Sequence, residues 1–73
     1  MSAREVKHEK HLVFVNFSDG KRSIINCKHV RCVVVNSAHV LVYYNSTGET
    51  LTAQTTEHAR KIEAVFNEAL LEA

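Results

Sequence analysis

Two segments of the chain, residues 11–25 and 39–53, share one order of apolar and turn residues. At an offset of 28 residues, the apolar run 12–15 aligns with the run 40–43, and Gly20 aligns with Gly48. These are the only two glycines, and proline is absent, so the residues best suited to tight turns stand at two corresponding points. The pattern predicts two β-hairpins with similar turns.

The turn of the first hairpin can be specified from its residues. Ser18-Asp19-Gly20 fits a type I turn followed by glycine in the left-handed conformation. This turn would place Val13 opposite Ile25 in the neighbouring strand. We expect the second hairpin to turn in the same way.

Runs rich in β-branched and aromatic residues predict five strands, and the end of the chain predicts a helix. The expected strands cover residues 11–17, 21–26, 31–36, 39–44 and 49–54. From Thr56 onward, apolar residues recur every three or four positions, which is typical of an amphipathic helix; they are Ala59, Ile62, Val65, Phe66, Ala69 and Leu70. Thr55 or Thr56 can cap this helix.

These elements predict a single small α+β domain. We expect residues 1–10 to form a polar N-terminal tail and residues 11–73 to form a β-β-β-β-β-α domain. Its five-stranded, mostly antiparallel sheet would combine the two similar hairpins with a middle strand. The C-terminal amphipathic helix would pack on one face of that sheet.

Several expected strands are apolar on both faces, which one helix cannot cover. An antiparallel sheet with one solvated face should alternate apolar and polar residues. The excess apolar surface predicts self-association, with a homodimer favoured, through Val34, Val40, Val42 and Tyr44. The alternative, compatible with it, is a sheet curled into a half-barrel that encloses its own interior.

The charge balance argues against a dedicated nucleic-acid binder, since the formal net charge is only +1. Basic residues nevertheless gather around the second strand and the crossover after it, at Lys21, Arg22, Lys28 and Arg31. A basic patch with nearby aromatic residues is one way in which small sheets bind single strands. Nucleic-acid binding through these four residues is therefore the alternative function.

A short cysteine- and histidine-containing segment offers the best candidate for chemistry. Cys27, His29 and Cys32 are residue types that bind zinc, but their spacing does not match paired Cys-x-x-Cys sites. Buried structural thiols explain both cysteines more simply. A nucleophilic Cys–His pair would lack an orienting group and an oxyanion hole. We therefore expect no enzyme activity, no metal and no cofactor.

The N-terminal residues lack the apolar core of a secretory signal, and no apolar run is long enough to span a membrane. Two cysteines are also fewer than disulfide-stapled secreted domains of this size carry. The sequence therefore predicts a cytoplasmic, non-enzymatic interaction or regulatory module. It would self-associate through apolar sheet surface and act through an unidentified protein partner.

Overall fold

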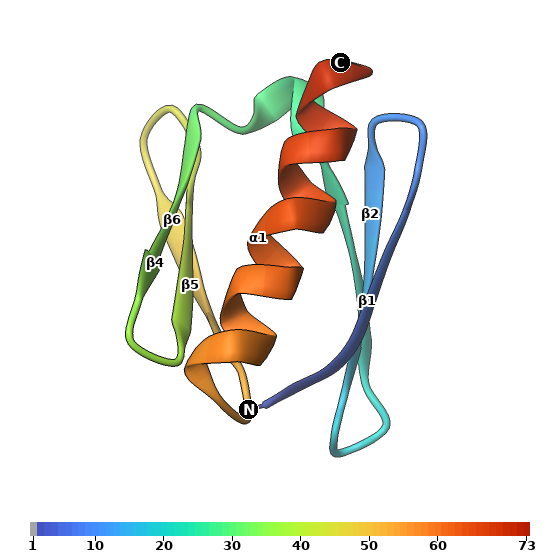
Figure 1. The fold of residues 1–73 in the computed structure, drawn as a ribbon. Coiled ribbons are helices and arrows are strands. Elements are labelled where there is room, and N and C mark those ends of the chain that lie inside the picture. The colour runs from blue at the N-terminus through green and yellow to red at the C-terminus, as the bar shows by residue number, and fades with distance from the viewer. Residues whose placement is uncertain (1) are drawn as a thin grey trace.

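In a computed structural model, which describes residues 2–73, six strands form two antiparallel sheets beside one C-terminal helix (Figure 1). The sheet orders are β1-β2-β3 and β4-β5-β6. The elements are β1 (Ala3–Glu9), β2 (Leu12–Phe17), β3 (Arg22–Asn26), the 3-10 turn η1 (Cys27–His29), β4 (Cys32–Asn36), β5 (His39–Tyr43), β6 (Gly48–Thr52) and α1 (Thr56–Leu71). The prediction of an α+β chain ending in a helix is confirmed, but that of one five-stranded sheet is wrong.

The additional strand is β1, in the segment predicted to be a polar tail. Residues 3–9 pair with β2 along its whole length, with Val6 opposite Val15 and His8 opposite Val13. Val6 packs against the core, while Lys7 points to solvent. Only a few side chains of this strand face the core, so most of its other positions can be charged. Its polarity was therefore a poor guide to its conformation.

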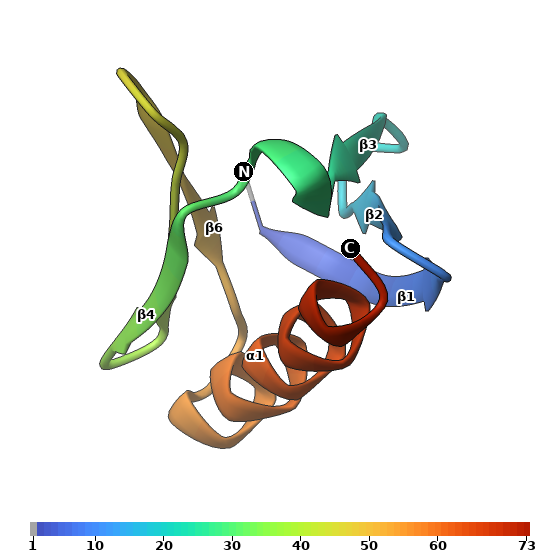
Figure 2. The same cartoon turned by 90° about the horizontal axis from the view of Figure 1, so that it is seen from above.

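Helix α1 joins the two sheets through one apolar stripe. Its buried residues are Ala59, Ile62, Phe66 and Ala69, and the hydroxyl of Thr55 caps the helix by accepting a 3.0 Å hydrogen bond from the His58 N–H. The helix contacts β1 and β2 on one side and β4 and β5 on the other. Figure 2 shows the two sheets splayed apart, with α1 lying across the side between β4 and β1. One hydrophobic core therefore serves both sheets.

The two sheets are two copies of one backbone unit, a three-stranded meander. Counting from the two-residue turn that ends the first strand of each, Val13 corresponds to Val40 and Val15 to Val42, an offset of 27. All four side chains are completely buried. The offset of 28 suggested by the sequence is wrong by one residue, because it matches Val13 with Leu41. A one-residue slip exchanges the two faces of a strand.

The second turn in each meander differs between the sheets. Gly20 has a φ of 90° and donates a 3.0 Å hydrogen bond to the Phe17 carbonyl, as the predicted type I turn with a left-handed glycine requires. Gly48 instead lies in β6 opposite Tyr43, with no positive φ. The turn there closes through a 2.8 Å hydrogen bond from the Tyr44 N–H to the Thr47 carbonyl. The prediction of two similar turns is therefore wrong.

A single parallel bridge between Ser2 and Thr52 connects the start of β1 to the end of β6. The backbone N–H of Ser18 also donates a 2.9 Å hydrogen bond to the Ser2 carbonyl. The bridge therefore joins the two sheets at one corner, and the Ser18 hydrogen bond holds Ser2 to its own sheet; elsewhere α1 packs between the sheets. The arrangement differs from a half-barrel, in which one sheet would curl continuously around the core.

Candidate interaction surface

The outward face of the β4–β5–β6 sheet is uncharged; we call it the uncharged face. Strand register places nine residues on it: Cys32, Val34, Asn36, His39, Leu41, Tyr43, Gly48, Thr50 and Thr52. None of the nine is Asp, Glu, Lys or Arg. Val34 lies opposite Leu41, and the side chains of Val34 and Tyr43 are 44% and 42% exposed. The middle of this face is therefore an apolar patch open to solvent.

The corresponding face of the β1–β2–β3 sheet is charged. It carries Glu5, Lys7 and Glu9 on β1 and Arg22 on β3. Lys7 occupies the position that Val34 occupies in the other sheet, and its ammonium lies 3.0 Å from the Glu5 carboxylate. Ile24, which is 63% exposed, is apolar and lies opposite Phe14, with Arg22 two residues before it on the same strand. The two outward faces thus differ far more than the two inward ones.

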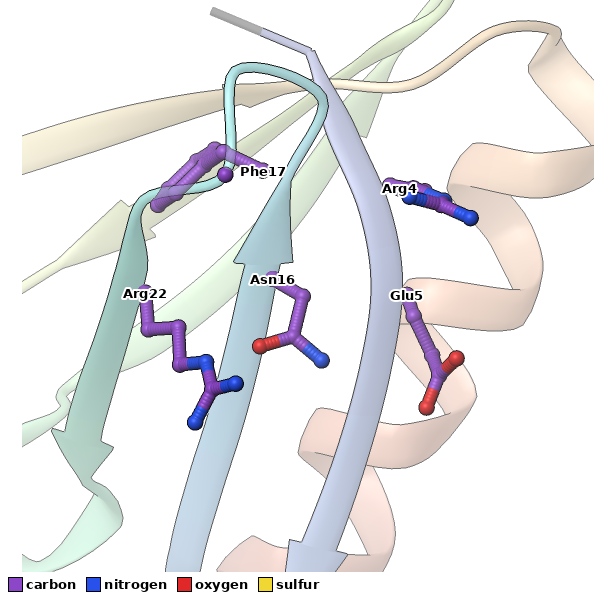
Figure 3. A pocket seen from close by; sticks show the side chains of 6 residues that line it. Arg4, Glu5, Asn16, Phe17 and Arg22 are labelled. Atoms are coloured by element: carbon purple, nitrogen blue, oxygen red, sulfur yellow. The ribbon is translucent and has the colours of Figure 1, made fainter.

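A polar hollow marks one end of the charged face. Its lining includes Arg4, Glu5, Asn16, Phe17 and Arg22. In Figure 3 the side chains of Arg22, Asn16 and Glu5 extend side by side from three neighbouring strands, while Arg4 lies on the side of α1. Because a carboxylate and guanidinium groups share this hollow, its charge is mixed. It is therefore not the purely basic surface that binding to a phosphate backbone favours.

A second, open hollow lies where the uncharged face meets the β5–β6 turn. Arg31, Cys32, Tyr43 and Tyr44 line it together with residues 45–48. The Tyr44 hydroxyl donates a hydrogen bond to the Glu49 carboxylate. Burial, followed by this contact with Glu49, raises the pKa of Tyr44 well above its usual range. Tyr44 therefore stays a neutral hydrogen-bond donor that steadies the turn beside the apolar patch.

The residues predicted for self-association fall on both faces of their sheet. Val40 and Val42 are completely buried within the chain, and Tyr44 packs against the same core. Only Val34 faces outward. The residues that share its face, Leu41 and Tyr43, were missed because the prediction did not fix the register between these two strands. Once the turn is placed at Ser37-Ala38, the alternation of side chains along β5 puts Leu41 and Tyr43 on the face of Val34.

The four basic residues proposed for nucleic-acid contact lie in two pairs. Lys21 and Arg22 stand at the β2–β3 turn, and Lys28 and Arg31 lie in or just after η1. Figure 1 shows this turn and η1 at opposite ends of β3. Five residues of strand span about 17 Å. The structure therefore does not gather the four cations into one patch.

The cysteine and histidine candidates also point to different places. Cys27 is buried, and its burial raises the pKa of its thiol. Cys32 is exposed on the uncharged face, so its expected burial is wrong, and His29 is exposed on η1. Among residues 2–73, no group of three potential metal-ligating side chains is brought together. Cys27 thus serves as a core residue, and a thiol that is hard to ionise is a poor nucleophile.

Comparisons with known proteins do not show which family this chain belongs to. No protein-family model matches the sequence, and no curated protein or solved structure matches it. Within the described residues, the only α-helix is too short and too polar to cross a membrane. Functional inference therefore rests on the chemistry of the surface.

Proposed function

We propose that this chain is a small non-enzymatic interaction module that associates with itself through the uncharged face and acts through a protein partner. The observation that carries the proposal is the contrast between equivalent faces. One has four charged residues, and the other has none and exposes Val34 on its edge strand and Tyr43 at the end of its central strand. Loss of charge around exposed aromatic and aliphatic side chains is what distinguishes the core of an interface from ordinary surface.

The position of the patch supports the same function. It sits on the sheet rather than on a loop, so its side chains are held by strand register and by a core of completely buried neighbours such as Val40 and Val42. A pre-ordered surface loses little side-chain and backbone entropy on binding. The uncharged face is therefore built to bind without rearrangement.

Sedimentation equilibrium of the wild-type chain tests the proposal. We expect reversible association at protein concentrations up to about 100 µM, the range in which weak interfaces associate. The double variant Val34→Lys/Leu41→Lys should sediment as a monomer, because it places two charges on the patch. Phe14→Lys is the matched control, since Phe14 occupies the position equivalent to Leu41 in the other sheet, and it should leave association unchanged.

Two outcomes would overturn the proposal. One is a wild-type chain that remains monomeric throughout this range. The other is oligonucleotide binding that weakens steeply with salt and is lost when Lys21 and Arg22 or Lys28 and Arg31 are replaced by Gln. The latter result would make the basic residues, rather than the uncharged face, the functional surface.

A further inference from the structure

The two sheets have four edge strands, and three of them are occupied or charged. The Ser2–Thr52 bridge joins one end of β1 to one end of β6. Strand β3 carries Arg22, directly preceded by Lys21, at its exposed side. Charged side chains on an edge strand discourage pairing with another chain. The fourth edge, β4, has no charged residue among its own five, although Arg31 directly precedes it and α1 contacts the strand.

Strand β4 has the chemistry of a pairing edge. Its sequence, Cys32-Val33-Val34-Val35-Asn36, contains no charge, proline or glycine. Val33 and Val35 face the core but are only half-buried, unlike the completely buried Val40 and Val42 beside them on β5. The border of the core along β4 is therefore still open to solvent.

The backbone of β4 also has a definite pattern of free groups. A two-residue turn, Ser37-Ala38, joins β4 to β5 and makes Asn36 and His39 the closing pair. Hydrogen-bonded and non-hydrogen-bonded pairs alternate along an antiparallel ladder. The N–H and C=O groups of Val33 and Val35 are consequently directed at the open edge.

We propose that the occupant of this edge is a second copy of the chain, whose β4 pairs antiparallel with the first about a two-fold axis at Val34. This inference rests on the proposed function and specifies the geometry of its self-association. In this register Val33 of each copy exchanges two hydrogen bonds with Val35 of the other copy. The N–H and C=O groups of both residues are therefore paired. The pair formed by the two copies of Val34 is a non-hydrogen-bonded one, the closer type of cross-strand pair.

Pairing in this way explains why β4 differs from its equivalent, β1. Lys7 occupies the β1 position that corresponds to Val34. A two-fold axis through Val34 would bring two lysines face to face if β4 carried the same residue. The two copies would then meet along the β4 side of their uncharged faces, with the two Val34 side chains in contact. The rest of both faces would form one six-stranded surface for the protein partner. Because the interface between the two copies is small beside the standard of roughly 1,600 Å² for stable complexes, we expect a weak, reversible dimer.

Complementary charges at position 34 provide the decisive experiment. Val34→Lys and Val34→Glu, each alone, should weaken dimerisation at least about tenfold, since like charges would oppose each other across the axis. An equimolar mixture of the two variants should associate at least as tightly as the wild type. Leu41→Lys, on the same face but on the central strand, should weaken dimerisation far less than Val34→Lys. Thermal unfolding of each variant verifies that it is folded.

Cross-linking supplies a second measurement that does not depend on charge. In a Cys32→Ser background, Val34→Cys should form a disulfide-linked dimer under mild oxidation, whereas Leu41→Cys should not. If the wild type dimerises but the mixture of charge variants does not recover association and Val34→Cys does not cross-link, edge pairing is wrong and the proposed function stands. A wild-type chain that stays monomeric would instead contradict both the edge pairing and the proposed function.

Discussion

The central strands of the two sheets are alike on the face toward the core, but the outward faces of the two sheets differ. Val13 and Val15 in one sheet and Val40 and Val42 in the other are all completely buried at equivalent positions. Outside, one sheet is charged and the other is not. Close packing favours apolar side chains of similar size at these central inward positions, whereas the outward faces are free to differ. The outward difference is therefore where a function specific to one sheet can reside.

The difference extends to single positions within otherwise equal strands. His8 in β1 corresponds to Val35 in β4, and Lys7 corresponds to Val34. His8 reaches α1 through a 2.9 Å contact between its Nε2 and the Glu68 carboxylate. A polar contact, His8–Glu68, thus joins β1 to the helix, whereas β4 contacts the helix through apolar packing. The two meanders can be compared experimentally one position at a time.

The largest effect should come from shortening equivalent core residues. Val15→Ala and Val42→Ala should each lower the free energy of unfolding by about 2 kcal/mol, since each leaves a cavity at a site with no solvent exposure. Urea denaturation measures both losses. Equal losses are expected because both valines belong to one core.

An unequal result would break the structural comparison. If Val42→Ala cost less than half as much as Val15→Ala, the β4–β5–β6 sheet would be a loosely attached hairpin unit rather than an equal partner in the core. Amide hydrogen exchange would then show β5 opening at a lower free energy than β2. Matching protection of the two central strands is the result that the shared core predicts.

The two glycines should respond differently to substitution. Gly20→Ala should cost about 1–2 kcal/mol because Gly20 has a left-handed backbone, which a Cβ disfavours. A Cβ at Gly20 would touch nothing, so the cost is conformational. At Gly48 the backbone is ordinary, but a Cβ would lie 3.1 Å from the Val42 carbonyl oxygen and 3.2 Å from Tyr43 Cδ1. The cost there is steric.

Asparagine separates these two causes, since it tolerates the left-handed conformation better than alanine does. Gly20→Asn should recover much of the stability lost in Gly20→Ala, whereas Gly48→Asn should be no more stable than Gly48→Ala. Thermal unfolding of the four variants measures this. Recovery by asparagine at both positions would contradict the different turn geometries.

These glycines also show what the sequence could and could not predict. The first turn was predicted correctly because Ser18-Asp19-Gly20 has strong local preferences, and the register of Val13 with Ile25 followed from it. The second turn was not, because Gly48 is present for the close approach of the Tyr43 ring. That approach is a cross-strand contact within the β5–β6 hairpin, and it depends on a register that the residue types of this turn do not fix. The helix was predicted well because its period and its Thr55 cap are both local.

The candidate surface was harder to predict than the fold, for a related reason. The excess of apolar strand residues was evident, but assigning each to a face required the register. Without that register, Val40 and Val42 were assigned to the surface and Leu41 and Tyr43 were left out. Similarly, β1 escaped notice because only pairing with β2 gives a charged segment such as residues 3–9 a strand conformation.

A smaller effect should come from the first turn of each meander. Lys10 and Ser37 have positive φ values, 54° and 58°, at the first position of equivalent two-residue turns. Glycine is preferred where such turns need positive φ. Lys10→Gly and Ser37→Gly should each raise the free energy of unfolding by about 0.5 kcal/mol, a net gain after the entropic cost of glycine.

Chemical denaturation of the two glycine variants and of the double variant checks this. The effects should add, because the turns belong to different sheets. Lys10→Ala and Ser37→Ala serve as controls, since alanine removes the side chain but keeps the Cβ. If these alanine variants stabilised the chain as much as glycine, the gain would come from the lost side chains rather than from the backbone.

The smallest effect should be the pH dependence of the stability that the His8–Glu68 contact adds between β1 and α1. The hydrogen bond to Glu68, and then the one to the Lys10 carbonyl, raise the pKa of His8 above its ordinary value of 6.5. A raised pKa means that the folded state binds the proton more tightly than the unfolded state does. The stabilisation is therefore fully present below about pH 6.5 and is lost as the pH rises through the folded pKa.

His8→Val, which copies the Val35 of β4, should remove this pH dependence. The difference in melting temperature between wild type and variant should shift in favour of the wild type on going from pH 8.5 to pH 6. Glu68→Gln should abolish the same slope, whereas Glu63→Gln, elsewhere on α1, should leave it in place. A slope that survives in both His8→Val and Glu68→Gln would mean that β1 is held to the helix by packing alone, as β4 is.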